Sequence, residues 1–268
     1  MANGRVVLLT GAAGGIGAAI TRALIGAGHS VAAVDRDAER LKQLATSERI
    51  HPIMADLSSE AACREAVASA VARFGKLEAV INNAGIGMSG IRGDAEVNLP
   101  GIEELTAEIW DRFYAINIRG HMLVTQAALP HLRAAKFGRI VNNTTSFRSM
   151  LRVNPYGPLK AALEALSAVW ATELKGDGIT VNVLIPGGPT DTPFISDDTG
   201  WDRAKMLSPE IMGPPACWMI SDEAADYTGN RIIAANWDAK LPGRAAAAKA
   251  GRAIGWPELG ADAVWLRG

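Results

Sequence analysis

The sequence has few cysteines, few aromatic residues and almost no net charge. Cys63 and Cys217 are the two cysteines among its 268 residues, and neither belongs to a CxxC pair, which indicates a reduced protein. A net charge of -1 at pH 7 provides no basic surface for nucleic acid or an anionic membrane. The first residues lack the apolar region of a signal peptide, and no apolar run is long enough to span a membrane. We therefore expect a cytoplasmic protein without nucleic-acid or membrane partners.

Metal-binding patterns are also missing from the sequence. The four histidines, at positions 29, 51, 121 and 131, show no ligand spacing with carboxylates on one helix face. We therefore expect no metal ion in the functional site.

Alanine and glycine are abundant instead. Hydrophobic residues make up 49% of the chain and aromatic residues 6%, which suits helices packed closely on a parallel sheet. Strands are expected at 6–9, 31–34, 50–55, 77–82, 139–143, 179–185 and 231–235, and helices from 16 to 26 and at 58–74, 106–135 and 156–175. This alternation predicts an α/β fold with a doubly wound, parallel, seven-stranded sheet. No linker interrupts it, so we expect a single domain over residues 1–237, followed by an extension over 238–268.

A glycine-rich stretch from Thr10 to Gly17, TGAAGGIG, lies between the first expected strand and the first expected helix. Glycine allows positive φ and lets a pyrophosphate approach the main chain, where a helix N-terminus offers free N–H groups. A mobile surface loop can have the same composition, but the flanking strand and helix favour a dinucleotide site. Asp35 follows Gly17 by eighteen residues, close to the ~20-residue offset at which a carboxylate meets the adenosine ribose.

Three motifs occur in the same order as in the short-chain dehydrogenase/reductase family. They are the TGxxxGxG spacing, the segment Asn82-Asn83-Ala84-Gly85, and YGPLK from Tyr156 to Lys160. The sequence resembles this family from residue 5 to about residue 235. The resemblance implies a Rossmann fold that binds a nicotinamide dinucleotide. It implies cofactor contacts from Gly11, Ala13, Gly15, Ile16, Gly17, Asp35, Arg36, Asp56, Leu57, Asn83, Ala84, Gly85, Tyr156, Lys160, Pro186, Gly187, Pro189, Thr190 and Thr192. From the residues alone, Asp56 and Leu57 fit a helix N-cap region nearly as well, and 82–85 also fits a plain turn.

Tyr156 and Lys160 lie four residues apart, on one face of the expected helix. A free tyrosine has a pKa near ~10, so a neighbouring ammonium is needed to favour the phenolate. The resemblance makes Tyr156 the proton-transfer group, with Lys160 lowering its pKa and holding the ribose. An accidental Tyr/Lys pair is the alternative, which the other motifs disfavour. Pro158 suits only the first turn of a helix, so we expect Tyr156 at the helix start.

Two further polar residues complete the catalytic set that the resemblance implies. Thr145 takes the place of the hydroxyl that holds the substrate carbonyl, although it precedes Tyr156 by eleven residues, about two fewer than is usual in the family. Ser146 is the second choice, because it would face the other side of an extended chain. Asn117 takes the place of the asparagine that bends its helix and completes a proton relay to the lysine; a capping role is its alternative.

Three irregular segments are expected around the substrate. The loop after 179–185 resembles the family's nicotinamide loop with about one extra residue, so Thr192 fits the cofactor contact best and Thr190 is the alternative; a plain proline-rich turn would also fit. Residues 193–215 have the polar, turn-rich composition of a mobile lid. Residues 86–101 form a long connection that we expect to line the substrate entrance.

Together these features predict an NAD-dependent oxidoreductase that transfers a hydride between nicotinamide and a secondary alcohol or ketone. The Asp35 carboxylate would repel the 2′-phosphate of NADP, but Arg36 could turn inward and bind it, so an NADP-dependent carbonyl reductase is the first alternative. A dinucleotide-binding regulatory protein without turnover is the second. The altered Thr145 region favours that second alternative, whereas the intact Tyr156 and Lys160 pair opposes it.

Self-association and a docked tail are also expected. Apolar residues occupy more than one face of the helix after Tyr156, which predicts a homodimer or homotetramer. Trp256 and Trp265 in the extension indicate that the tail docks, because a disordered tail would be poor in tryptophan. We expect a short helix at 244–254 in this tail, packed on the lid or on a neighbouring subunit.

Overall fold

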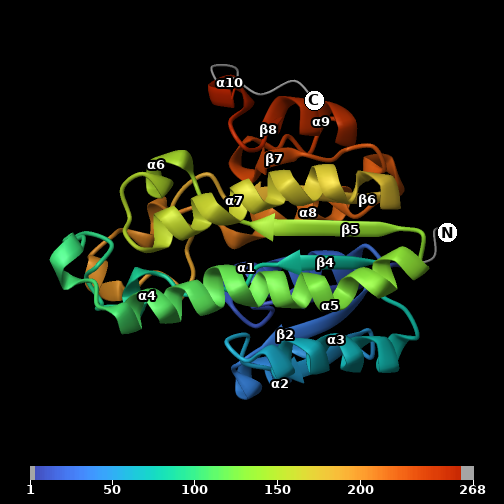
Figure 1. The fold of residues 1–268 in the computed structure, drawn as a ribbon, viewed down its shortest axis with the longest axis horizontal. Coiled ribbons are helices and arrows are strands. Elements are labelled where there is room, and N and C mark those ends of the chain that lie inside the picture. The colour runs from blue at the N-terminus through green and yellow to red at the C-terminus, as the bar shows by residue number, and fades with distance from the viewer. Residues whose placement is uncertain (1–3, 261–268) are drawn as a thin grey trace, which may run out of the picture.

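The computed structural model describes residues 4–260 and builds them around one eight-stranded sheet (Figure 1). The strands are β1 (Val6–Thr10), β2 (Ser30–Asp35), β3 (Ile50–Met54), β4 (Ala79–Asn82), β5 (Gly138–Asn143), β6 (Ile179–Ile185), β7 (Asn230–Ile233) and β8 (Gly251–Ala253). The α-helices are α1 (Gly15–Gly26), α2 (Ala38–Leu44), α3 (Glu60–Phe74), α4 (Ala107–Tyr114), α5 (Gly120–Ala134), α6 (Phe147–Met150), α7 (Tyr156–Glu173), α8 (Gly213–Met219), α9 (Gly243–Ala250) and α10 (Pro257–Gly260). Strands and helices alternate along most of the chain, which confirms the predicted α/β class.

The strands lie in the order β3-β2-β1-β4-β5-β6-β7-β8. All neighbours from β3 to β7 pair in parallel, and β8 pairs antiparallel with β7. The seven predicted parallel strands are therefore present, and one short strand is added to them. The strand order reverses between β1 and β4, and in such sheets ligands bind at the carboxyl ends of the strands beside the reversal.

The added strand corrects the expectation of a helix over 244–254. Helix α9 ends at Ala250, and Gly251 is extended, with φ -96° and ψ 157°. In β8, Gly251 lies opposite Ile232 and Ala253 opposite Asn230. The alanine-rich sequence favours a helix locally, but the free edge of β7 offers hydrogen-bond partners to the next three residues. β8 forms by pairing with β7, which lies about twenty residues earlier in the chain, so the residues 251–253 by themselves do not predict a strand.

Each face of the sheet carries its own layer of helices, because successive residues of a strand point to opposite faces. Val7 and Leu9 of β1 belong to a buried cluster that includes Leu24 of α1. Val6 and Leu8 belong to a second cluster, formed with residues of α3, α5 and α7. The sheet is therefore covered on both faces, as predicted for a doubly wound fold.

The helix expected over 106–135 is divided into α4 and α5 by a π-helical turn at Ala115–Arg119. Asn117 lies in this turn and is fully buried. Its side-chain Nδ2 donates to the carbonyl oxygen of Phe113, 3.1 Å away, and so competes with the regular helical ladder. The regular α-helix is therefore interrupted at Asn117.

The C-terminal extension lies against the domain, at the top of Figure 1. Ile254 is buried with Val183 and Ile185 of β6. The Trp256 ring lies 5.9 Å from the ring of Phe147, the first residue of α6. Trp265 is outside the described residues. The part of the extension that the structure describes therefore reaches α6.

Helix α7 has 18 residues and is the longest helix among residues 4–260. No helix of this described part combines the length and the apolar character needed to cross a membrane. Part of the second apolar face expected on α7 is covered within the chain: Ala168 packs beside Ile254, and Leu166 packs against the cluster around Phe113. Val169 remains 59% exposed. The uncovered apolar surface is thus smaller than the sequence suggests.

Candidate active site

A cavity of about 1070 Å³ lies at the carboxyl ends of the central strands. Its walls include residues from the glycine-rich turn, from the ends of β2, β4 and β5, from α7 and from the loop after β6. The predicted residues on these walls are Gly11, Ala13, Gly15, Ile16, Gly17, Asp35, Arg36, Asp56, Leu57, Asn83, Ala84, Gly85, Thr145, Tyr156, Lys160, Pro186, Gly187, Pro189, Thr190 and Thr192. The fold therefore brings every predicted site residue except Asn117 to one cavity.

The glycine-rich turn packs too closely for side chains. Gly11 has φ +64°, and a Cβ there would lie 2.7 Å from the Cα of Ala84. A Cβ on Gly17 would lie 1.9 Å from the carbonyl oxygen of Gly11. Helix α1 begins at Gly15 with no side-chain cap and no acidic residue in its first turn. Its N-terminus thus presents uncapped N–H groups and the positive end of the helix dipole to the cavity, which suits a pyrophosphate.

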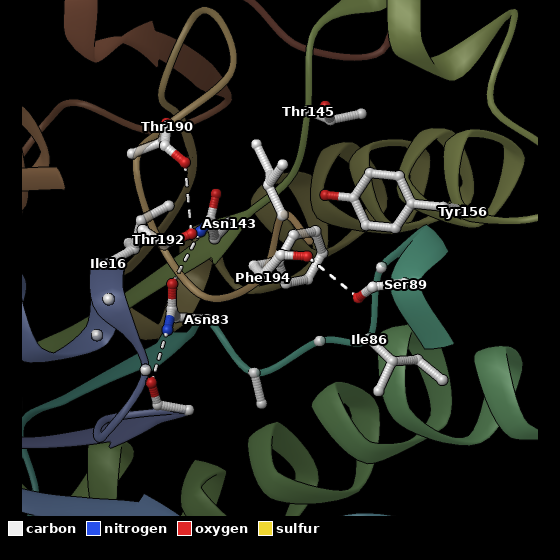
Figure 2. A pocket seen from close by; sticks show the side chains of 18 of the residues that line it. Ile16, Asn83, Ile86, Ser89, Asn143, Thr145, Tyr156, Thr190, Thr192 and Phe194 are labelled. Carbon is white, nitrogen blue, oxygen red and sulfur yellow. Dashed lines mark hydrogen bonds between the residues drawn. The ribbon is translucent and has the colours of Figure 1, made fainter. Parts of the chain in front are cut away.

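Hydrogen bonds tie this turn to the ends of β4 and β5 (Figure 2). Thr10 Oγ1 accepts from the backbone N–H groups of Asn83, at 3.0 Å, and Ala84, at 3.1 Å. Asn83 Nδ2 donates to the carbonyl oxygens of Thr10 and Gly11, both at 3.1 Å, and its Oδ1 accepts from Asn143 Nδ2 at 2.8 Å. The Asn83 side chain is therefore occupied within the protein and acts by holding the turn in place.

Charged side chains line the cavity beside the glycine-rich turn. The Asp35 carboxylate accepts from the backbone N–H of Ala13 at 3.0 Å and from that of Asp37 at 3.1 Å. Each carboxylate oxygen has a further lone pair for a ligand hydroxyl. Asp56 Oδ1 accepts from the N–H of Ser58 at 2.9 Å, while Ser59 is the N-cap of α3. Asp56 thus lines the cavity and also forms the turn before that helix.

His121 is a buried residue of the site that the sequence patterns do not single out. Its Nε2 lies 2.8 Å from the carbonyl oxygen of Ala84, to which it donates as the neutral tautomer. Burial, and then the Lys160 charge, lower the pKa of His121 to about 3. The imidazole is therefore neutral near pH 7 and holds the wall formed by residues 83–85. Its position, four residues after Asn117 in an apolar stretch, is the available sequence signal.

Tyr156 is the first residue of α7, as expected, and Pro158 falls in the first helical turn. The Tyr156 hydroxyl points toward Thr145 (Figure 2). Burial raises the pKa of Tyr156 to about 12, and the hydrogen bond with Thr145 opposes that rise. Its ring also packs edge-on against Phe194, with centroids 5.8 Å apart. The phenol is therefore neutral at pH 7 and well placed to donate a proton.

Lys160 lies beneath the same cavity. Its Nζ donates to the carbonyl oxygen of Asn143 at 2.8 Å and lies 5.8 Å from the centroid of the Tyr156 ring. Burial lowers the pKa of Lys160 to about 7. For Tyr156, burial is the larger effect on the pKa and Thr145 the lowering one, so the lowering of this pKa by Lys160 stays a prediction. The ammonium is directed to Asn143 rather than to the phenol.

Thr145 and Ser146, the two candidates for holding a carbonyl, make different contacts. Ser146 is the N-cap of α6: its Oγ accepts from the N–H of Ser149 at 3.2 Å and lies 3.0 Å from Ser149 Oγ. Thr145 instead faces Tyr156 (Figure 2). This arrangement favours Thr145 for the contact with substrate.

Asn117 does not line the cavity but approaches it from behind. Its Nδ2 donates to the carbonyl oxygens of Ile86, at 3.2 Å, and Phe113, at 3.1 Å. Its Oδ1 is buried and has no hydrogen-bond partner among the described residues. A Cβ on Gly85 would lie 2.9 Å from that oxygen and 3.7 Å from Lys160 Nζ. Asn117 and Lys160 therefore approach the same side of Gly85. Because the Asn117 Oδ1 has no partner among the described residues, it can accept a hydrogen bond in a proton relay.

The loop after β6 brings both candidate threonines to the cavity. The Thr192 side chain covers the start of α1, because a Cβ on Gly15 would lie 2.3 Å from Thr192 Cγ2. Thr192 Oγ1 donates to the carbonyl oxygen of Thr190 at 3.4 Å, and Thr190 Oγ1 to that of Gly188 at 3.2 Å. The direct packing on α1 favours Thr192 for a contact with cofactor.

Comparison with known proteins agrees with this geometry. The family model described as short chain dehydrogenase matches residues 5–202. The chain belongs to the short-chain dehydrogenase family. The "Probable galactose dehydrogenase GalD" of Rhizobium meliloti (strain 1021) is 34% identical over 249 residues, covering 85% of this chain and 93% of that protein.

Two solved structures show the same fold. The 3-ketoacyl-(acyl-carrier-protein) reductase from Brucella melitensis, complexed with NADH, has a TM-score of 0.75 and 26% identity, covering 86% of this chain and 96% of its own. A blue fluorescent protein from a metagenomic library, in complex with NADPH, has a TM-score of 0.72 and 27% identity, again covering 86% and 96%. The resemblance identified from the motifs is therefore confirmed at the level of family and fold.

The side of the cavity away from the glycine-rich turn is built from distant segments. Ser89 Oγ donates to the carbonyl oxygen of Phe194 at 3.2 Å, which joins the connection 86–101 to the loop after β6 (Figure 2). A Cβ on Gly87 would lie 2.4 Å from the Phe194 ring. Further wall residues that the motifs do not predict are Met88, Arg148, Arg152, Phe194 and Trp201. Met88, Phe194 and Trp201 belong to the segments 86–101 and 193–215 that the sequence places around the substrate, whereas Arg148 and Arg152 lie in and after α6, which the sequence does not single out.

The region expected as a lid over 193–215 has two parts. Phe194, Ile195 and Trp201 line the cavity. Arg203 Nη1 holds this part through Asp191 Oδ1 at 2.8 Å. From Pro209 onward the chain packs on α1 instead, with Met212 fully buried. Only the first part is therefore placed to cover a substrate.

Proposed function

We propose that the protein is an NAD-dependent oxidoreductase that transfers a hydride between nicotinamide and a secondary alcohol or ketone. The observation that carries this proposal is the orientation of the Tyr156 hydroxyl toward Thr145, inside the cavity that also receives the uncapped N-terminus of α1. These groups suit a carbonyl oxygen at one end and a dinucleotide pyrophosphate at the other. The relatives with NADH and NADPH in their structures support a cofactor of this class.

The residues present fit such a cofactor. The N–H groups at the start of α1 would hold the pyrophosphate, Asp35 the adenosine ribose, and Lys160 the nicotinamide ribose. The loop from Pro186 to Thr192 would cover the nicotinamide. When bound, nicotinamide supplies the carbon that accepts or donates the hydride.

The chain itself supplies the proton and the orientation. In the direction of ketone reduction, the neutral Tyr156 phenol donates its proton to the carbonyl oxygen, while Thr145 Oγ1 donates a second hydrogen bond to the same oxygen. In alcohol oxidation the Tyr156 phenol must first release its proton to solvent through the relay, and the phenolate oxygen then receives the proton of the alcohol. Lys160, with its pKa lowered to about 7, exchanges protons easily near neutral pH, and the free Oδ1 of Asn117 accepts on the inner side of the relay.

NAD is the proposed cofactor because the Asp35 carboxylate lies at the ribose end. The alternative, NADP, is supported by Arg36, which lines the same end of the cavity. Binding titrations of both cofactors test the choice: wild-type protein should bind NAD more tightly, and Asp35→Ala should reduce that preference. Tighter binding of NADP by wild type, or a preference unchanged in Asp35→Ala, would contradict the proposal.

The reaction is tested with a panel of secondary alcohols and ketones, including sugars because of the galactose dehydrogenase relative. Each is incubated with NAD or NADP, and the absorbance of the reduced nicotinamide is followed. We expect turnover of at least one secondary alcohol or ketone. Tight cofactor binding without any turnover would instead support the regulatory alternative.

We further propose that the protein is cytoplasmic and forms a homodimer or homotetramer. The observation behind self-association is a set of exposed apolar side chains on three helices: Trp110 and Tyr114 on α4, Met122 on α5 and Val169 on α7. Light scattering at micromolar concentration should show more than a monomer, and Val169→Glu should weaken the association. A monomeric wild type would contradict this part of the proposal.

A further inference from the structure

A buried ion pair lies directly behind Thr145. Glu164 is fully buried on α7, on the same helical face as Tyr156 and Lys160. Arg231 comes from β7 and is 9% exposed. Its Nη1 lies 3.2 Å from Glu164 Oε1. The pair therefore joins α7, the helix that begins with Tyr156, to strand β7.

Both members of this pair also bind the chain at Thr145. Glu164 Oε2 accepts from Thr144 Oγ1 at 3.1 Å. Arg231 Nη2 donates to the carbonyl oxygen of Thr145 at 3.0 Å. The pair thus binds the backbone of Thr145 and the side chain of the residue before it, and neither Glu164 nor Arg231 is among the residues that line the cavity.

Stability alone is a weak explanation for this arrangement. Removing two charges from water costs several kcal/mol per ion, and a buried ion pair seldom stabilises a fold more than apolar residues of similar size. The planar guanidinium, in contrast, fixes direction, because one rigid group donates a hydrogen bond to the Thr145 carbonyl and forms an ion pair with the Glu164 carboxylate. The contact is made where the sheet ends: Thr144 N still donates to Leu184 O of β6, at 3.3 Å, and α6 begins at Phe147.

We propose that Glu164 and Arg231 are positioning residues, which hold Thr145 at the orientation needed for its hydrogen bond to the substrate carbonyl. This inference rests on the proposed function of Thr145. In this chain the segment between Thr145 and Tyr156 is short, so the position of Thr145 depends on support from β7 and α7. Neither Glu164 nor Arg231 touches substrate.

The first test compares Arg231→Met and Arg231→Lys with Arg133→Met. Arg133 is a matched control, because it forms an exposed ion pair with Asp177 at 2.7 Å, on α5 and outside the cavity wall. A displacement of about 1 Å at a reacting group costs up to about 10²-fold in rate. We therefore expect kcat to fall by about 10-fold to 10²-fold in both Arg231 variants, with the cofactor Kd changed by less than about twofold.

The lysine variant separates positioning from charge balance. Lysine keeps the positive charge beside Glu164 but lacks the fork that also reaches Thr145 O. A role limited to charge balance predicts wild-type kcat in Arg231→Lys. That result, or a fall in kcat no larger than in Arg133→Met, would overturn the proposal.

Double variants identify the residue through which the pair acts. Thr145→Ala should lower kcat by itself, and Arg231→Lys should then cause little further loss, because the group that it positions is already gone. Losses that multiply in the double variant would contradict the inference. If Thr145→Ala keeps wild-type kcat, the proposed role of Thr145 fails, and this inference fails with it.

A structural measurement covers the case of insoluble variants or missing turnover. The methyl resonance of Thr145, assigned with Thr145→Ser, should move in Glu164→Gln and in Arg231→Lys but not in Arg133→Met. Unchanged resonances would overturn the inference even if no substrate is found. If the wild type turns over no alcohol or ketone, it is the proposed function that fails, and the methyl shift still tells whether the pair positions Thr145.

Discussion

The two ends of the cavity are built in different ways. At the proposed cofactor end, the glycine-rich turn follows β1 directly and starts α1, and Asp35 closes the next strand. At the proposed substrate end, the wall comes from the connection 86–101, the segment around α6 and the loop after β6. The contact between Ser89 and Phe194, for example, spans 105 residues of sequence. One end is thus a local strand-turn-helix unit, and the other is an assembly of distant loops.

This difference explains which parts of the site can be predicted from sequence. Gly11, Gly15 and Gly17 are recognisable because their spacing is imposed by one turn and one close approach to a ligand. Residues such as Phe194 and Trp201 have no such local requirement. They reach the cavity only when the loops fold, so a substrate cannot be named from them.

The same reasoning applies to the fold. The seven parallel strands follow from short apolar runs that alternate with helices, and all seven are present. β8 could not be predicted, because it depends on the free edge of β7. The pKa of Tyr156 is a similar case: the sequence indicates Lys160 as its neighbour, but burial and the orientation of the ammonium toward Asn143 emerge only from packing.

The largest expected effect lies at the junction of the two ends. Tyr156→Phe removes the proton-transferring hydroxyl and should lower kcat by about 10²-fold to 10⁴-fold. The cofactor Kd should stay near that of wild type, because the glycine-rich turn and Asp35 are untouched. Steady-state kinetics and a cofactor titration check both values. A variant that keeps most of its turnover would exclude Tyr156 as the proton donor.

Next in size is the comparison of Thr145→Ala with Ser146→Ala. Loss of a donor to the developing oxyanion costs about 10²-fold to 10³-fold in kcat, which we expect for Thr145→Ala. Ser146→Ala should instead lose about 1 kcal/mol of unfolding free energy, because it removes the N-cap of α6. Kinetics and denaturant unfolding of the two variants test this. A loss of kcat confined to Ser146→Ala would reverse the assignment.

Lys160 gives a smaller effect that depends on pH. Its pKa is about 7 in the fold and is ordinarily 10.5, so above pH 7 the unfolded chain binds more protons than the native protein. The unfolding free energy of wild type should therefore rise relative to Lys160→Met as pH increases from 7 to 10, by up to about 1.4 kcal/mol per pH unit. The rise ends above the ordinary pKa. Denaturant unfolding at several pH values provides the difference, and a constant difference would show that the native ammonium is not destabilised by burial.

The smallest effect concerns the C-terminal extension. Trp256→Ala removes the contact with Phe147 at the start of α6, and we expect KM to rise a few-fold while the cofactor Kd stays unchanged. Truncation after Asp238 should act in the same direction but more strongly, because it also removes β8. The matched substitution Phe74→Ala, which removes an aromatic contact with His51 outside the cavity wall, should leave KM unaltered in comparison. Equal KM values in wild type, Trp256→Ala and the truncated protein would mean that the extension only covers apolar surface.

The central claim, hydride transfer between a carbinol carbon and nicotinamide, is tested most directly with a deuterated substrate. A secondary alcohol from the panel is labelled with deuterium at its carbinol carbon, and the reduced cofactor formed by wild-type protein is analysed by mass spectrometry. The account predicts that the deuterium moves to the nicotinamide ring, with one label for each ketone formed. Formation of ketone with the label released to water, or with an unlabelled reduced cofactor, would contradict it.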